Sequence, residues 1–262
     1  MTLELAILEH PATGSETDPP LLIAHGLYGS ARNFNSLGKA LATNRRVVMV
    51  DMRNHGGSPW DDEMSYPAMA ADLAGVVERA CGGRAVVLGH SMGGKAAMAL
   101  AVSRPGLVAG LIVADIAPVA YDHSHEGYID AMREVDLSAV SRRSDADPLL
   151  ARAIPEKMLR AFLLQNLIVE GGTARWRLNL DALKDSLPTL MAWPATWPHS
   201  DYDGPTLFLH GSASDYVTED MHPSIRRMFP AAEFVTLDGA GHWLHAERPA
   251  EFLSALTGWL NV

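Results

Sequence analysis

Short apolar runs alternate with longer amphipathic stretches along most of the chain. Several runs, such as Leu21–Ala24, are almost continuously hydrophobic, which is typical of strands buried on both faces of a parallel sheet. The expected strands are Leu3–Glu9, Leu21–Ala24, Arg46–Val50, Arg84–Leu88, Leu111–Ala114, Thr206–Leu209 and Glu233–Leu237. The expected helices between them are Ala31–Ala42, Tyr66–Ala80, Met92–Ser103 and Pro249–Leu260. The alternation predicts an α/β fold with a mostly parallel sheet flanked by helices.

The alternation stops between residues 121 and 197. This segment has helical stretches, such as Glu126–Val135 and Glu156–Ile168, but no convincing buried strand. We therefore expect a helical cap, residues 121–197, inserted into a core made of residues 1–120 and 198–262. Such a cap would lie over the C-terminal edge of the sheet, where open α/β sheets bind ligands. An ordinary run of helices on the sheet face is the alternative.

Composition narrows the class of protein. The chain has 262 residues, of which 48% are hydrophobic and 20% charged, which is typical of a globular protein. The net charge of −10 argues against nucleic acid or an anionic membrane as partner. Cys81 is the single cysteine, so no intramolecular disulfide can form. No apolar run could span a bilayer, and the N-terminus lacks the basic region of a signal peptide, so we expect a cytoplasmic protein.

The stretch Ala85–Gly94 is the most informative of the sequence. A hydrophobic strand enters Gly89-His90-Ser91-Met92-Gly93, and a helix rich in small residues follows at once. This G-x-S-x-G pattern between strand and helix is that of the nucleophile elbow of the α/β-hydrolase fold. The pattern predicts that Ser91 is a catalytic nucleophile in a strained turn with an exposed hydroxyl. An inert serine in a tight turn is the alternative.

An oxyanion hole is expected beside the nucleophile. In this fold one donor comes from the residue after the nucleophile, and the other from the loop that follows an earlier strand. That loop is His25-Gly26-Leu27-Tyr28-Gly29, directly after the strand Leu21–Ala24. We therefore predict that the backbone N–H groups of Leu27 and Met92 hold the oxyanion.

Eleven histidines compete for the role of general base. His242 lies in Asp238-Gly239-Ala240-Gly241-His242, after the last strand and before the final helix, which is where this fold places its base. His25 and His90 lie at strand ends, where a structural hydrogen bond is the simpler interpretation. His123 and His125 form an H-x-H pair without a third ligand pattern, so the sequence predicts neither a metal nor a cofactor.

The carboxylate that orients the base has two candidates. Asp215 lies in the usual region after the strand Thr206–Leu209, but the common spacing G-x-x-D-x-x-V puts Ser214 at the acid position. Asp115 ends the strand Leu111–Ala114, and a buried carboxylate there needs a partner. We favour Asp115, with Ser214 as a supporting hydrogen-bonding group and Asp215 as the alternative acid.

Several motifs together resemble one branch of the α/β-hydrolases. The motifs are His25-Gly26-Leu27-Tyr28-Gly29-Ser30, residues 50–59 (VDMRNHGGSP), Gly89-His90-Ser91-Met92-Gly93-Gly94-Lys95, Asp115-Ile116-Ala117-Pro118-Val119 and Gly241-His242-Trp243-Leu244-His245-Ala246. They are similar to those of the YbfF-type bacterial esterases and their mitochondrial abhydrolase-domain relatives. The resemblance covers almost the whole core and the cap less clearly. It implies carboxylesterase activity on short acyl esters, with acyl-CoA thioesters as a second substrate class, and it supports Asp115 as the acid.

The sequence thus predicts a serine carboxylesterase that hydrolyses short- to medium-chain acyl esters through an acyl-enzyme. The expected partner is a small-molecule ester, and the chain acts as a monomer or homodimer. A cofactor-free C–C bond hydrolase, a perhydrolase and an aminopeptidase use the same triad and are the alternatives among enzymes. A ligand-binding module on this fold is the alternative outside them.

Overall fold

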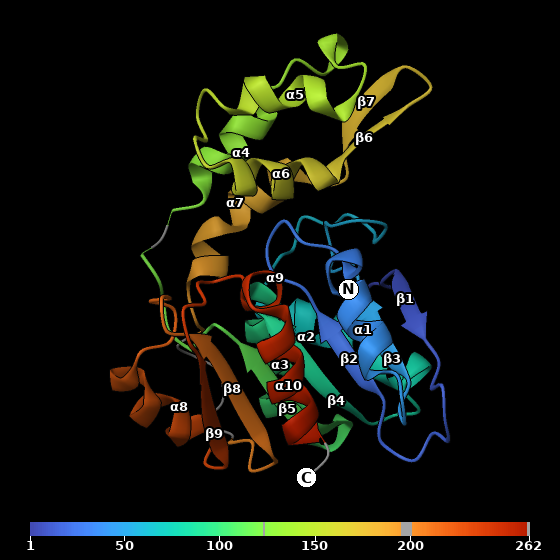
Figure 1. Cartoon of the computed structure of the whole chain (residues 1–262), viewed down its shortest axis with the longest axis vertical. Helices are drawn as coiled ribbons and strands as arrows, with labels where there is room; N and C mark the ends of the chain where they lie inside the picture. Colours follow the sequence, from blue (N-terminus) through green and yellow to red (C-terminus); the bar gives the residue numbers. More distant parts are fainter. Residues whose placement is uncertain (123, 195–200, 261–262) are drawn as a thin grey trace.

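A computed structural model describes residues 1–122, 124–194 and 201–260 of the chain (Figure 1). A seven-stranded sheet forms its centre, in the order β1-β3-β2-β4-β5-β8-β9. The strands are β1 (Ile7–His10), β2 (Leu21–Ala24), β3 (Val47–Val50), β4 (Ala85–His90), β5 (Val108–Ala114), β8 (Thr206–Gly211) and β9 (Ala232–Leu237). All neighbours pair in parallel except β1, which runs antiparallel to β3. The mostly parallel sheet predicted from the hydrophobic runs is confirmed.

Helices cover both faces of this sheet, and alternate strand residues show why. In β2, Leu22 and Ala24 belong to one cluster of buried residues, and Leu21 and Ile23 to the other. The first cluster includes α2 (Tyr66–Ala80), α3 (Met92–Ser103) and α8 (His222–Met228). The second includes α1 (Asn35–Leu41), α9 (Leu244–Glu247) and α10 (Pro249–Leu260). Because successive strand residues point to opposite faces, one short apolar run serves two cores.

The predicted helices α2, α3 and α10 have the bounds expected from the sequence. The Ser65 hydroxyl accepts a hydrogen bond from the Ala68 amide, which caps the start of α2. The stretch expected as one helix over Ala31–Ala42 is instead a 3-10 helix at Ala31–Phe34 followed by α1. The first strand also begins later than expected, at Ile7 rather than Leu3.

The segment between β5 and β8 forms a separate layer, drawn in green to gold in Figure 1, that extends away from one end of the sheet. It holds α4 (Glu126–Arg133), α5 (Arg143–Leu150), α6 (Lys157–Leu163) and α7 (Leu180–Met191), and α7 runs back to the core. The expected cap boundary at residues 197 and 198 lies outside the described residues. Within the described ranges, no helix is both long and apolar enough to cross a membrane.

The expectation that this segment lacks strands was wrong. Strands β6 (Leu167–Glu170) and β7 (Thr173–Trp176) form an antiparallel hairpin, so the helix expected over Glu156–Ile168 ends early. Gly171 and Gly172 make the turn with φ values of 58° and 78°, a backbone conformation that glycine adopts without strain. In β7 the buried residues Ala174 and Trp176 alternate with exposed ones, so the hairpin follows the period of a half-buried strand.

Candidate active site

Ser91 lies in a sharp turn between β4 and α3. Its φ is 52° and its ψ −120°, a conformation that side-chain-bearing residues rarely adopt, and its amide donates to the Ala114 carbonyl at 3.0 Å. The turn requires glycine on both sides. A Cβ on Gly89 would collide with the Gly93 carbonyl, and one on Gly93 would collide with the Ala24 carbonyl. The local sequence therefore forces the Ser91 hydroxyl out of the sheet edge.

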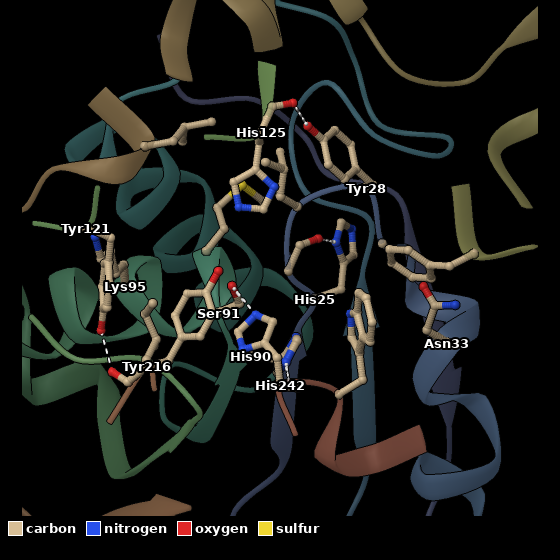
Figure 2. A pocket seen from close by; sticks show the side chains of 18 of the residues that line it. His25, Tyr28, Asn33, His90, Ser91, Lys95, Tyr121, His125, Tyr216 and His242 are labelled. Atoms are coloured by element: carbon tan, nitrogen blue, oxygen red, sulfur yellow. Dashed lines mark hydrogen bonds between the residues drawn. The ribbon is translucent and has the colours of Figure 1, made fainter. Parts of the chain in front are cut away.

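His242 faces this hydroxyl from the loop after β9 (Figure 2). Its Nε2 lies 3.1 Å from Ser91 Oγ, and its Nδ1 lies 2.7 Å from Asp115 Oδ2. Glu247 fixes the loop by accepting from the amides of Gly241 and Trp243, one on each side of His242. The His90 imidazole donates to the His242 carbonyl at 2.9 Å. These bonds hold the imidazole between a hydroxyl and a carboxylate, as acyl transfer by a triad requires.

Asp115 is fully buried at the end of β5, with a φ of 52°. Besides His242, its carboxylate accepts from the Ser214 hydroxyl at 2.5 Å and from the Gly211 amide at 3.2 Å. Three donors thus compensate a buried negative charge. The Asp215 side chain, in contrast, is exposed. The geometry brings Asp115 against the histidine and Ser214 against Asp115.

Leu27 and Met92, the residues expected to supply oxyanion donors, both line the pocket above Ser91. Nearby amides are engaged: that of Gly29 donates to the Gly26 carbonyl, and that of Tyr28 to the His55 imidazole. The Leu27 and Met92 amides have no such acceptor within the part of the chain that the structure describes. Met92 also begins α3, where the helix dipole favours a developing negative charge.

The pocket over Ser91 and His242 has a volume of about 210 Å³. The core contributes Phe34 and Ile116, and the inserted segment contributes Leu159, Phe162, Leu190 and Met191 to its lining. Ser91 and His242 lie side by side in this pocket, and further polar side chains, such as Tyr28 and His125, lie around it (Figure 2). A mostly apolar cavity with a few convergent polar groups is typical of a small-molecule site.

Sequence reasoning missed two aromatic contacts of the site. The Tyr216 ring stacks on His242 with centroids 3.9 Å apart, and the His245 ring stacks on Phe34 at 4.4 Å. Neither contact leaves a signal in the sequence, because each joins elements far apart in the chain. Burial lowers the pKa of His245 to about 4, so this imidazole is neutral.

His25 and His90 make structural hydrogen bonds. His25 Nδ1 donates to the Gly26 carbonyl, and its Nε2 accepts from the Met52 amide. Burial lowers the pKa of His25 to about 4 and that of His90 well below its usual range. Both rings are therefore neutral supports of the loops next to Ser91, Leu27 and His242.

Lys95 is a buried lysine one turn after Ser91. Its Nζ donates to the carbonyls of Met191 and Ala192 at the end of α7, and it lies over the ring of Tyr121, 4.8 Å from the centroid. Burial lowers the pKa of Lys95 to about 7. Position 123 of the H-x-H pair lies outside the described residues. Among those described, no three His, Cys, Asp or Glu side chains gather as metal ligands.

Comparison with known proteins gives consistent matches. A sequence model of the "Alpha/beta hydrolase family" matches residues 21–255. The sn-1-specific diacylglycerol lipase ABHD11 of Mus musculus is 45% identical over 94% of this chain and 82% of its own. Esterase YbfF of Escherichia coli is 36% identical over 99% of this chain and 100% of its own. A solved structure, a marine microorganism esterase, superposes with a TM-score of 0.91 at 38% identity, covering 98% of this chain and 100% of its own.

Proposed function

The chain belongs to the alpha/beta hydrolase family and is an ester-hydrolysing enzyme, and we propose that it is a serine carboxylesterase that works through an acyl-enzyme. The hydrogen-bonded chain from Ser91 through His242 to Asp115 carries this proposal, because it joins a nucleophile, a base and an orienting carboxylate. The relatives named as esterases and lipases support the reaction class.

In the proposed first half-reaction, His242 Nε2 takes the Ser91 proton while Ser91 Oγ bonds to the ester carbonyl carbon. The carbonyl oxygen becomes an oxyanion, which the Leu27 and Met92 amides hold. Collapse of this intermediate breaks the bond to the leaving oxygen, which takes the proton from His242. Water then attacks the acyl-enzyme by the same steps, with His242 again as base. Asp115 keeps Nδ1 protonated throughout, so that Nε2 faces the serine.

The apolar pocket supports short- to medium-chain acyl groups as substrates. Its volume of about 210 Å³ and its lining by Leu159, Phe162, Leu190 and Met191 suit an aliphatic chain. Acyl-CoA thioesters present the same carbonyl to Ser91 and form the second substrate class to test. The name of the mouse relative, a diacylglycerol lipase, supports glycerol esters as a third.

The test is hydrolysis of p-nitrophenyl esters from acetate to palmitate by wild type and Ser91→Ala. We expect a maximum at short to medium chains, and loss of activity by a factor of about 10⁴ or more in the variant. Acyl-CoA hydrolysis can be followed with a thiol reagent, because the single cysteine, Cys81, is buried. Equal inactivity of wild type and variant on all esters would overturn the proposal in favour of C–C cleavage, perhydrolysis or ligand binding.

A further inference from the structure

The loop that carries Leu27 makes a tight turn with a strained residue. The Gly29 amide donates to the Gly26 carbonyl at 3.0 Å, which closes a turn over Leu27 and Tyr28. Tyr28 is the third residue of this turn, and its φ is 64°. Turns with a positive φ at this position usually have glycine or asparagine there. A tyrosine stays in this conformation only where its surroundings hold it.

Two side chains hold the backbone of Tyr28, one on each side. The Tyr28 amide donates to His55 Nε2 at 3.1 Å, and the Tyr28 carbonyl accepts from Asn166 Nδ2 at 2.7 Å. All three residues are buried, with exposed fractions of 3% or less. The two bonds fix the peptide planes before and after Tyr28. The plane after Tyr28 carries the Gly29 amide, which donates to the Gly26 carbonyl. That carbonyl shares a peptide plane with the Leu27 N–H, so the direction of the Leu27 amide depends on this turn.

The tautomer of His55 makes its Nε2 a hydrogen-bond acceptor. Its Nδ1 donates to the Arg53 carbonyl at 2.8 Å, which leaves Nε2 without a proton for the Tyr28 amide. Burial, together with the neighbouring His25, lowers the pKa of His55 to about 3, so the ring stays neutral. This support comes from the core, from the loop after β3.

Asn166 comes from the inserted segment, in a 3-10 helix at Leu164–Asn166 between α6 and β6. Its own backbone is fixed, because its carbonyl accepts from the Arg177 amide at 2.8 Å, just after β7. The hairpin of β6 and β7, which was not predicted from the sequence, therefore directs the Asn166 side chain toward the loop that carries Leu27 and Tyr28. The side-chain amide is a neutral donor, so it satisfies the Tyr28 carbonyl without the free-energy cost of a buried charge.

We propose that Asn166 is a positioning residue for the reaction: it holds the Tyr28 carbonyl so that the Leu27 amide points at the oxyanion, and the inserted segment thereby completes the oxyanion hole. The proposal rests on the proposed function, in which Leu27 supplies an oxyanion donor. Loss of the Asn166 bond lets the strained turn relax. The Leu27 amide then turns away from the transition state, while the apolar pocket that binds the substrate stays in place.

The test compares Asn166→Ala and Asn166→Asp with the matched control Gln165→Ala. Gln165 is the preceding residue and also joins the segment to the core, because its Oε1 accepts from Asn33 Nδ2 at 2.8 Å, but this bond is exposed. On the best p-nitrophenyl ester we expect kcat of both Asn166 variants to fall about 10- to 100-fold, with KM within about threefold. The control is expected to stay within about twofold in both parameters.

Inhibition by a trifluoromethyl ketone separates positioning from general damage. Ser91 Oγ bonds to its carbonyl carbon, the carbonyl electron pair moves to the oxygen, and the serine proton moves to His242. Because this adduct carries the oxyanion, its Ki is expected to rise by the same factor as kcat/KM falls. Near-unchanged circular dichroism and Tm would show that the variants are folded. Asn166→Asp keeps the side-chain shape if Asn166→Ala does not fold.

Different outcomes identify which proposal fails. If Ser91→Ala retains wild-type activity, the proposed function itself is wrong. If Ser91→Ala is inactive while both Asn166 variants keep wild-type kcat and Ki, only the role of Asn166 is overturned. A rise in KM alone, or an equal loss in Gln165→Ala, would show that Asn166 merely fastens the segment to the core, which also overturns the proposal.

Discussion

The ring of Tyr216 lies nearly parallel to that of His242, with an angle of 20° between their planes and 3.9 Å between their centroids. The backbone of Tyr216 is fixed in turn, because its carbonyl accepts from the Tyr121 hydroxyl at 2.6 Å. The Tyr121 hydroxyl also accepts from the Ala117 amide, two residues after Asp115. One network therefore joins the segment after Asp115 to the ring that covers His242.

We expect this stack to restrict the rotation of His242 away from Ser91. Tyr216→Ala should lower kcat about fivefold, because an aromatic contact of this kind contributes about 1 kcal/mol. Tyr216→Phe keeps the stacked ring and should stay within about twofold of wild type. Steady-state kinetics on a p-nitrophenyl ester measures both. An equal loss in the two variants would show that the tyrosine hydroxyl, rather than the stack, is what matters.

The two candidate acids can be separated by matched amide variants. Asp115→Asn should lower kcat about 10³- to 10⁴-fold, because an amide at this place favours the wrong tautomer of His242. Asp215→Asn should change kcat less than about threefold, since that side chain is exposed. The measurement is kcat on the best p-nitrophenyl ester for both proteins. A large loss in Asp215→Asn with little loss in Asp115→Asn would reverse the assignment.

Ser214 offers a graded test of the same site. Its hydroxyl donates to Asp115 Oδ2, the oxygen that also receives the bond from His242. Ser214→Ala should lower kcat about 3- to 30-fold, because one of three donors to a buried carboxylate is lost. The remaining donors, Gly211 and His242, should keep the protein folded. A kcat equal to that of wild type would show that Ser214 contributes nothing to the orientation of the acid.

The features that were predicted correctly from the sequence are mostly local. The turn at Ser91 could be predicted because its strand, its glycines and its helix follow one another within about ten residues, and sterics dictates the rest. The helix α2 and the strands of the sheet could be predicted in the same way, from the hydrophobic periodicity of each segment. In these stretches, the pattern that indicates the structure lies within one short segment of the sequence.

What could not be predicted depends on contacts between distant segments. The sequence left Asp115 and Asp215 as alternatives because the choice depends on which loop reaches His242 in space. The hairpin at β6 and β7 was missed because its strands have only four residues each and are half-buried. Asn166 carries no motif at all: its bond to Tyr28 spans 138 residues. Folding the inserted segment onto the core creates this contact.

The close packing around Ser91 predicts that an added methyl group is harmful at Gly93 but tolerated at Gly127 in α4. Gly93→Ala should prevent stable folding or abolish activity, because its Cβ would overlap the backbone carbonyls of Ala24 and His25 at the end of β2. Gly127→Ala is the control, since a Cβ in α4 would meet no described atom within 4 Å, and alanine favours the helix by about 1 kcal/mol. Thermal denaturation and kcat distinguish the two. Wild-type stability in Gly93→Ala would contradict the described elbow.

Acid should destabilise the protein through its buried imidazoles. Burial lowers the pKa of His25 and His245 to about 4 and of His55 to about 3. Between pH 6.5 and about 4 the unfolded chain therefore binds protons that the folded one does not, so stability falls as pH falls, up to about tenfold in the unfolding equilibrium per pH unit for each ring. Urea denaturation at several pH values measures this slope. His245→Phe keeps an aromatic ring against Phe34 and should reduce the slope by one proton; an unchanged slope would mean that His245 is protonated in the folded state.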